Sequence, residues 1–233
     1  MRLQDNLEVE FKLSVTGDDP EAFLNEIAAL PELGGMRLGP PAEHRLHDVY
    51  WDIEDGGLRA RKLSLRLRSI DDHLVFTVKG GSTSSAGLFS RYELEMPANA
   101  DTWPDVRAVL IGEGAPLGLD MAGDEPTDWL RAAGLHPTQD RVTRRTIRYA
   151  YTAPTADQPL AELALDRTRF DFGKALVDYW EIEIEQLDGG EDAPRAIGRA
   201  LVARYPDRLE PSTMGKYSRG LAIERELRAT GQL

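Results

Sequence analysis

The sequence predicts a mainly β (α+β) fold in which many antiparallel strands form a closed barrel or a sandwich. Apolar and polar residues alternate strictly in the segment 7–15, and the segments 63–69, 74–79 and 90–96 show the same two-residue period of a half-buried strand. Further strand patterns lie at residues 48–52, 141–151, 160–167, 168–172, 175–180 and 181–187. Roughly eight or more strands with few helices are typical of barrels and sandwiches.

Helical patterns are confined to a few segments. A helix is expected to begin at Asp18 or Asp19, with a proline in its first turn, and to run through LNEIAAL. Residues 101–135 are expected to be an interrupted helical excursion between two halves of the sheet. A capped helix is expected at 191–206, and a charged terminal helix at 221–231.

Glycine, proline and small polar residues mark the expected loops. Residues 32–45 are rich in glycine and proline, and the EDGG at 54–57 is typical of a turn. The segment GGSTSSAG at 80–87 is expected to be a flexible loop between two strands.

The composition excludes several functional classes. The 233 residues contain no cysteine, which excludes a disulfide scaffold, thiolate metal sites, iron–sulfur clusters and cysteine catalysis. With 28 basic and 40 acidic residues the net charge is −12, so neither nucleic acid nor an anionic membrane is an expected partner. The start of the chain has no apolar signal segment, and no apolar run approaches the roughly 18 residues of a spanning helix. We therefore expect a cytoplasmic protein.

Carboxylates occur two residues apart on three predicted strands. They are Glu8 and Glu10, Glu93 and Glu95, and Glu181, Glu183 and Glu185. Residues so spaced lie about 6.6–6.8 Å apart on one face of a strand, where like charges repel unless a cation lies between them. Oxygen ligands suit a hard divalent ion. Since the chain has only four histidines and no cysteine, the pattern argues against zinc and for Mg²⁺ or Mn²⁺.

Basic residues also repeat on the polar faces of these strands, and they allow two interpretations. They are Lys12, Arg66, Arg68, Lys79 and Arg91. For any single strand, a charged face exposed to solvent is the ordinary interpretation. Taken together, the faces contain few neutral residues. That composition would suit a water-filled barrel, in which acids hold a metal and basic groups hold a polyanion.

The sequence resembles the CYTH superfamily, the triphosphate tunnel metalloenzymes. Glu8-Val-Glu10-Phe-Lys12 reproduces the ExExK signature of that family at the N-terminus. Matching segments follow in order: LRLR at 65–68, FTVKG at 76–80, SRYELE at 90–95, the arginine-rich strand at 141–148, LALDR at 163–167, EIEIE at 181–185 and GKY at 215–217. The resemblance extends from residue 7 to about residue 220.

The resemblance implies a fold and an activity. It implies an eight-stranded antiparallel closed tunnel barrel with helices packed outside, and a single domain of this type over residues 1–233. It also implies divalent-metal-dependent hydrolysis of a small-molecule triphosphate by a monomer or homodimer, with inorganic triphosphate as the expected substrate. Members also hydrolyse thiamine triphosphate or nucleoside triphosphates, and one branch makes cyclic AMP from ATP. Two alternatives therefore stay open: an adenylyl cyclase, and a binder of polyphosphate or a phosphometabolite that has no catalytic activity.

The resemblance also implies roles for individual residues. The metal ligands would be Glu8, Glu10, Asp166, Glu183 and Glu185. The triphosphate would be bound by Lys12, Arg66, Arg68, Lys79, Arg91, Arg145 and Lys216. The catalytic residues would be Lys12 together with Glu93 and Glu95, of which the two glutamates could hold a second metal or orient water. Either Arg144 or Arg145 could face inward, with Arg145 favoured, and Glu181 could shift the second acidic pair by one step.

Overall fold

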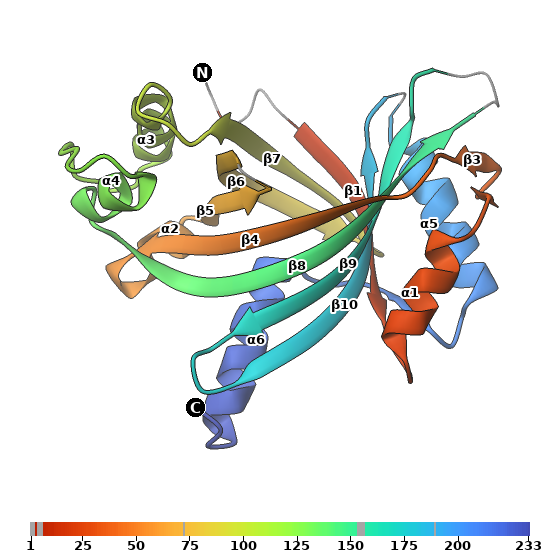
Figure 1. Ribbon diagram of the computed structural model, residues 1–233. Helices are drawn as coiled ribbons and strands as arrows, with labels where there is room; N and C mark the ends of the chain where they lie inside the picture. The colour runs from red at the N-terminus through yellow and green to blue at the C-terminus, as the bar shows by residue number, and fades with distance from the viewer. Residues whose placement is uncertain (1–2, 4–6, 72, 153–156, 189) are drawn as a thin grey trace.

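Eight strands close into an antiparallel barrel in the part of the chain that the computed structural model describes, which is residues 3, 7–71, 73–152, 157–188 and 190–233 (Figure 1). The barrel strands are β1 (Leu7–Val15), β4 (Ala42–Ile53), β5 (Leu63–Ile70), β6 (His73–Ser85), β7 (Leu88–Pro97), β8 (Leu135–Tyr151), β9 (Ala161–Asp171) and β10 (Leu176–Gln186). Their order around the barrel is β8-β4-β5-β6-β7-β1-β10-β9, and β9 pairs with β8 to close it. The predicted fold class is confirmed.

Shorter strands and the helices surround the barrel. The short strands are β2 (Glu32–Leu33) and β3 (Met36–Leu38), which extend the sheet from β8, and β11 (Leu209–Pro211), which pairs with β1. The helices are α1 (Pro20–Ala28), α2 (Gly57–Ala60), α3 (Trp103–Gly112), α4 (Pro126–Ala132), α5 (Asp192–Arg204) and α6 (Lys216–Ala229), with a 3₁₀ turn at Glu54–Gly56. Within the described residues, no helix is both long enough and apolar enough to cross a membrane.

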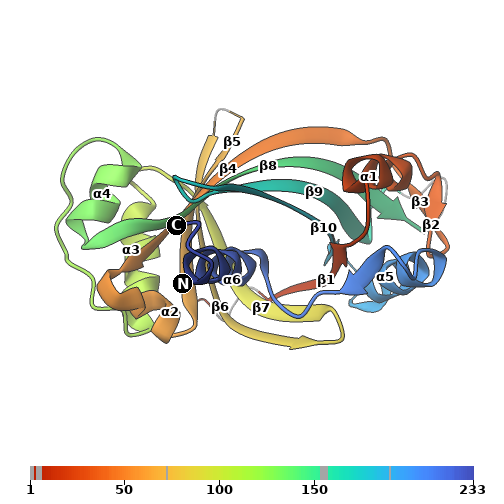
Figure 2. The same ribbon diagram turned by 90° about the horizontal axis from the view of Figure 1, so that it is seen from below.

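The apolar side chains pack on the outside of the barrel in two clusters. In one, α1 and α5 cover β1, β9 and β10, and Ile27, Ile184 and Ile197 are among its buried members. In the other, α2, α3 and α4 cover the opposite end, with Trp103 and Trp129 in the cluster (Figures 1 and 2). Because side chains alternate along a strand, burying the apolar set outside directs the polar set into the barrel.

Three sequence predictions of local structure are corrected. Residues 32–45 are not a loop, since they form β2, β3 and the start of β4. Residues 80–87 are not a loop either: β6 continues to Ser85 through a register shift between Gly80 and Thr83. In both segments, pairing with neighbouring strands stabilises sequences of low strand propensity. The strand expected at 48–52 is the end of the longer β4, for the same reason.

The second half of the chain holds fewer and longer elements than its sequence predicts. The segments expected at 160–172 and 175–187 are one strand each, β9 and β10, which form a hairpin. The terminal helix begins five residues earlier than expected, at Lys216. At the helix expected at 191–206, Glu191 makes no side-chain capping hydrogen bond to α5. The helical excursion at 101–135 is confirmed as α3 and α4.

The contact between α5 and β1 allows a stability test. A Cβ added at Gly198 of α5 would lie 2.7 Å from Cε1 and 2.8 Å from Cγ of Phe11, which separates Glu10 from Lys12 on β1. At an unhindered helical site, Gly→Ala stabilises by about 1 kcal/mol. Here overpacking should reverse the sign, so we expect G198A to lower the free energy of unfolding by about 1–3 kcal/mol.

Chemical denaturation measures this change, and Gly112 at the end of α3 provides the control. A Cβ there meets no atom within 4 Å, so G112A should leave the stability unchanged or slightly raised. If G198A is as stable as G112A, α5 does not pack against Phe11 of β1 as closely as described.

Candidate active site

A cavity of about 960 Å³ lies inside the barrel and is lined by charged side chains. The residues assigned from sequence that line it are Glu8, Lys12, Arg66, Arg68, Lys79, Arg91, Glu93, Glu95, Arg145, Glu183, Glu185 and Lys216. The other two, Glu10 and Asp166, are buried and pair with lining residues. The structure therefore brings the whole assigned set together, although the roles of its members stay predictions.

The acidic residues of β1 are paired with basic residues of β1 itself, β6 and β7. Glu8 accepts from Arg91 Nε at 2.6 Å and lies 3.2 Å from Lys79 Nζ. Glu10 lies 2.7 Å from Lys12 Nζ, which also contacts Glu183 across the β1–β10 pair. Burial opposes the charge on Lys12, but the carboxylates of Glu10 and Glu183 outweigh it and raise the Lys12 pKa.

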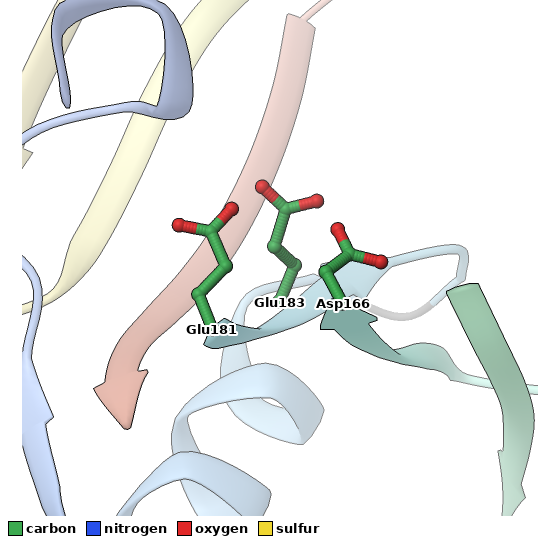
Figure 3. A group of neighbouring side chains, drawn as sticks. All are labelled: Asp166, Glu181 and Glu183. Atoms are coloured by element: carbon green, nitrogen blue, oxygen red, sulfur yellow. The ribbon is translucent and has the colours of Figure 1, made fainter. Parts of the chain in front are cut away.

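A second acidic group is centred on Lys216, at the start of α6. Its ammonium nitrogen lies 2.5 Å from Asp166, 2.6 Å from Glu181 and 3.3 Å from Glu183. The three carboxylates extend from β9 and β10 toward one point, and one oxygen of each lies within 4.8 Å of the others (Figure 3). The sequence analysis left Glu181 as an alternative member of the second acidic pair, because its place in EIEIE puts it on this face.

Arg145 belongs to the same group and settles the register of β8. It donates to Asp166 at 2.7 and 2.6 Å and to Glu183 at 2.5 Å. The side chain of Arg144 is 65% exposed and contacts Glu21 on the outer surface. The favoured inward position of Arg145 is therefore confirmed.

The wall made by β4, β5 and β8 is basic. Asp48 of β4 accepts two hydrogen bonds from Arg68 at 2.6 and 2.9 Å and two from Arg141 at 3.1 and 3.0 Å. Arg66 lies 3.7 Å from the same carboxylate. Burial opposes the charge on Asp48, but the three arginines outweigh it and hold its pKa well below the usual range.

The acidic residues of β7 face this wall. Lys79 lies 2.7 Å from Glu93, and Arg66 lies 3.9 Å from Glu93 and 3.8 Å from Glu95. Burial raises the pKa of Glu93, against the lowering effect of Lys79. Glu93 is thus a half-buried carboxyl with a raised pKa beside the basic groups.

Comparison with known proteins identifies the family of this tunnel. A family model of the CYTH domain matches residues 6–214. The chain belongs to the CYTH domain family. It is 26% identical over 185 residues to an inorganic triphosphatase of Haemophilus influenzae, a match that covers 78% of this chain and 46% of that protein. The chain therefore spans about half of that relative.

Solved structures share the fold of this CYTH domain. A putative adenylyl cyclase from Hippeastrum, described as having a dominant triphosphatase activity, aligns with a TM-score of 0.59 at 17% identity. The alignment covers 92% of this chain and 95% of that one. A putative adenylate cyclase from Bacillus halodurans aligns with a TM-score of 0.51 at 17% identity, over 92% of this chain and 98% of that one.

Glu185 is a carboxylate of the CYTH tunnel that has no ion-pair partner among the described residues. Glu185 of β10 lies directly opposite Glu10 of β1 in the strand register. Burial, together with the nearby charges of Glu8 and Glu10, raises its pKa to about 8. A set of carboxylates that leaves one member unbalanced fits a hard divalent cation.

The other acidic group is already balanced by basic side chains. Its carboxylates, those of Asp166, Glu181 and Glu183, contact Lys216, and two of them also contact Arg145. The structure thus divides the carboxylates assigned to the metal between two groups.

The raised pKa of Glu185 predicts how stability depends on pH. Glu8 and Glu10 on β1, Glu162 on β9 and Lys79 on β6 are the charged groups that act on it. The folded protein keeps this proton up to about pH 8, whereas the unfolded chain releases it near 4.5. Glu185 should therefore reduce stability progressively as pH rises from 4.5 to 8.

Glutamine at position 185 removes this titration. At pH 9 in EDTA, we expect E185Q to be more stable than the wild-type protein by about 2–4 kcal/mol, and at pH 4.5 to be equally stable. Denaturant unfolding at both pH values measures the difference, and E210Q, on the exposed β11, is the control. Equal stability of E185Q and wild type at pH 9 would contradict the raised pKa.

Proposed function

We propose that this CYTH domain hydrolyses a triphosphate in its tunnel with a divalent metal, Mg²⁺ or Mn²⁺, and that inorganic triphosphate is the preferred substrate. The observation that carries the proposal is the division of one buried cavity into a basic wall and an acidic group with an unbalanced carboxylate. Family membership supports it, as do the Haemophilus influenzae relative named an inorganic triphosphatase and the dominant triphosphatase activity attributed to the Hippeastrum protein.

The basic residues are suited to binding a linear polyanion. Charge-assisted hydrogen bonds from guanidinium and ammonium groups to phosphate oxygens are among the strongest available to a protein. The proposed ligands of the triphosphate are Lys12, Arg66, Arg68, Lys79, Arg91, Arg145 and Lys216, all of which line the cavity. Phosphoryl transfer depends mainly on such positioning and on neutralisation of charge.

The carboxylates proposed to hold the metal are Glu8, Glu10 and Glu185. When bound there, a divalent ion would neutralise charge on the phosphate oxygens and polarise the phosphorus. Asp166 and Glu183 also stay predicted metal ligands: Lys216 and Arg145 engage their oxygens, just as Arg91 engages those of Glu8 and Glu10.

Hydrolysis also requires a group that accepts a proton from water. Glu93 is our choice, because its raised pKa favours accepting that proton and because Lys79 holds its carboxylate in the cavity. Glu95 would orient the water. The water oxygen would bond to the terminal phosphorus as the bridging P–O bond breaks, giving phosphate and pyrophosphate. Lys12, fixed between Glu10 and Glu183, would stabilise the charge that develops on the leaving oxygen.

The decisive test compares substrates. Phosphate release is measured from inorganic triphosphate, thiamine triphosphate and ATP, with Mg²⁺ or Mn²⁺ and with EDTA. We expect metal-dependent release that is fastest from inorganic triphosphate. Chromatography of the products formed from ATP tests the cyclase alternative. Formation of cyclic AMP and pyrophosphate would show an adenylyl cyclase in place of the proposed triphosphatase. Calorimetric binding of triphosphate without any release would instead indicate a binding protein.

A further inference from the structure

Asp48 combines deep burial with an excess of positive partners. Its side chain is 1% exposed and does not line the cavity, whereas Arg66, Arg68 and Arg141 do. Three guanidinium groups from β5 and β8 thus converge on one carboxylate that lies behind them. Arg66 also lies near Glu93 and Glu95, whereas Arg68 and Arg141 share Asp48 as their carboxylate partner. Since one arginine would suffice to neutralise Asp48, Arg68 and Arg141 together with Asp48 keep a net positive charge at the cavity.

We propose that Asp48 is a positioning residue that holds Arg66, Arg68 and Arg141 as a preassembled receptor for phosphate groups. The inference rests on the proposed function and adds two residues to it, Asp48 and Arg141, that sequence reasoning did not select. The receptor lies on the opposite side of the barrel from Glu8 and Glu10, because β4 and β1 are four strands apart in a ring of eight. The phosphate chain would then lie between the receptor and the metal-binding carboxylates.

The hydrogen bonds of the arginines hold two of them in fixed orientations. Arg68 and Arg141 each engage Asp48 through Nε and Nη2, which fixes the planes of both guanidinium groups. Arg141 is held further by the Tyr50 hydroxyl at 2.9 Å. Donors held in place before the ligand arrives need no reorganisation when it binds.

The sign of one substitution separates positioning from charge. D48N removes a negative charge next to an anion site, so charge alone predicts tighter binding of a polyanion. If Asp48 acts by holding the arginines, they repel one another in D48N, turn away and must be reassembled by the ligand. We therefore expect weaker binding, with the affinity and kcat/KM reduced by about 10- to 100-fold.

Asp52 provides a matched control on the same strand. It is also buried, at 2% exposure, but it accepts from backbone amides, those of Ile53 and Leu58 at 2.7 Å and Arg59 at 3.3 Å. D52N therefore removes an equally buried carboxylate without releasing the three arginines. We expect its affinity for triphosphate to stay within about threefold of wild type.

The experiment measures binding of inorganic triphosphate by calorimetry in EDTA, and then kcat/KM with Mg²⁺, for wild type, D48N and D52N. A double-mutant cycle then combines D48N with R68M. If Asp48 acts through Arg68, D48N should reduce the affinity less in the R68M protein than in the wild-type protein. The inference would be overturned if D48N bound triphosphate at least as tightly as wild type. It would also be overturned if the fold-changes in affinity of D48N and R68M simply multiplied in the double mutant.

The experiment also covers a D48N variant that does not fold and a wild-type protein that does not bind triphosphate. If D48N does not fold, D48E keeps the charge and moves the carboxylate by one methylene, and we expect several-fold weaker binding; binding equal to wild type would overturn the inference. If the wild-type protein neither binds nor hydrolyses triphosphate, the proposed function fails, and the inference fails with it. If the wild-type protein is active and D48N binds and hydrolyses triphosphate equally well, the inference about Asp48 fails and the proposed function stands.

Discussion

Replacing Glu8 and Glu10 together by glutamine is expected to reduce metal-dependent phosphate release by about 1000-fold or more. The substitutions keep the size of both side chains and remove two of the three charges that would hold the cation. They also leave Arg91 without the carboxylates that it contacts at 2.6 Å and 2.5 Å. Release from inorganic triphosphate in Mg²⁺ or Mn²⁺ measures the loss.

The controls distinguish loss of the site from loss of the fold. The E21Q/E43Q variant also removes two paired glutamates, but on the outer surface, where they contact Arg144 and Thr146. We expect it to keep wild-type activity. The circular dichroism spectrum of E8Q/E10Q should match that of wild type, because the apolar clusters outside the barrel are untouched. Full activity in E8Q/E10Q would refute the assignment of the metal to these residues.

Strict alternation made the strand content of the fold predictable from sequence. On β5, Leu63, Leu65 and Leu67 alternate with polar residues, and the structure buries them outside the barrel in the cluster that α2, α3 and α4 cover. Alternation alone could not decide between a barrel and a sandwich, because both bury one face of each strand. The closing pair of β8 with β9 is a contact between distant strands, and only the resemblance to a known family implied it.

The segments that sequence misjudged are those stabilised by non-local pairing. Residues 80–85 are mostly glycine and serine, which have little strand propensity, yet residues 83–85 pair with residues 88–90 of β7. Gly81, with φ of +61°, allows the bulge that shifts this register. Neither the partner strand nor the bulge is visible in the local composition.

The candidate site shows the same division. The inward position of Arg145 follows from alternation once the phase of β8 is chosen, and that phase also places Arg141 inside. The importance of Arg141 could not be inferred, because it depends on Asp48, 93 residues away in sequence. Glu181 similarly gains its partner from Lys216 on α6. Alternation identifies which side chains face inward, whereas the partner of each is decided by the closure of the barrel.

Lys216 is the residue whose loss should destabilise the protein most. Its ammonium group is the shared partner of Asp166, Glu181 and Glu183, and its side chain is only 8% exposed. Removing one partner of a buried ion pair leaves an uncompensated charge, which costs about 3–5 kcal/mol. K216M keeps an unbranched side chain of similar length. At pH 8, we expect it to lower the free energy of unfolding by that amount.

The pH dependence of this loss identifies its cause. Burial already raises the pKa of Glu181 against the opposing effect of Lys216, so without the lysine its folded pKa should rise further. The folded variant then takes up a proton at a pH where the unfolded chain does not, and its stability increases as pH falls toward the ordinary carboxyl pKa. The gap between wild type and K216M should therefore narrow between pH 8 and pH 5.

Denaturant unfolding of both proteins across this range tests the prediction. K174M, in the exposed hairpin between β9 and β10, is the control and should match wild type at every pH. A loss in K216M that does not change with pH would attribute the effect to packing of α6 rather than to charge. If K216M loses no stability at pH 8, water in the tunnel stabilises the three carboxylates to the same extent as the ammonium group of Lys216. Lys216 would then be free to leave them for a phosphate at little cost.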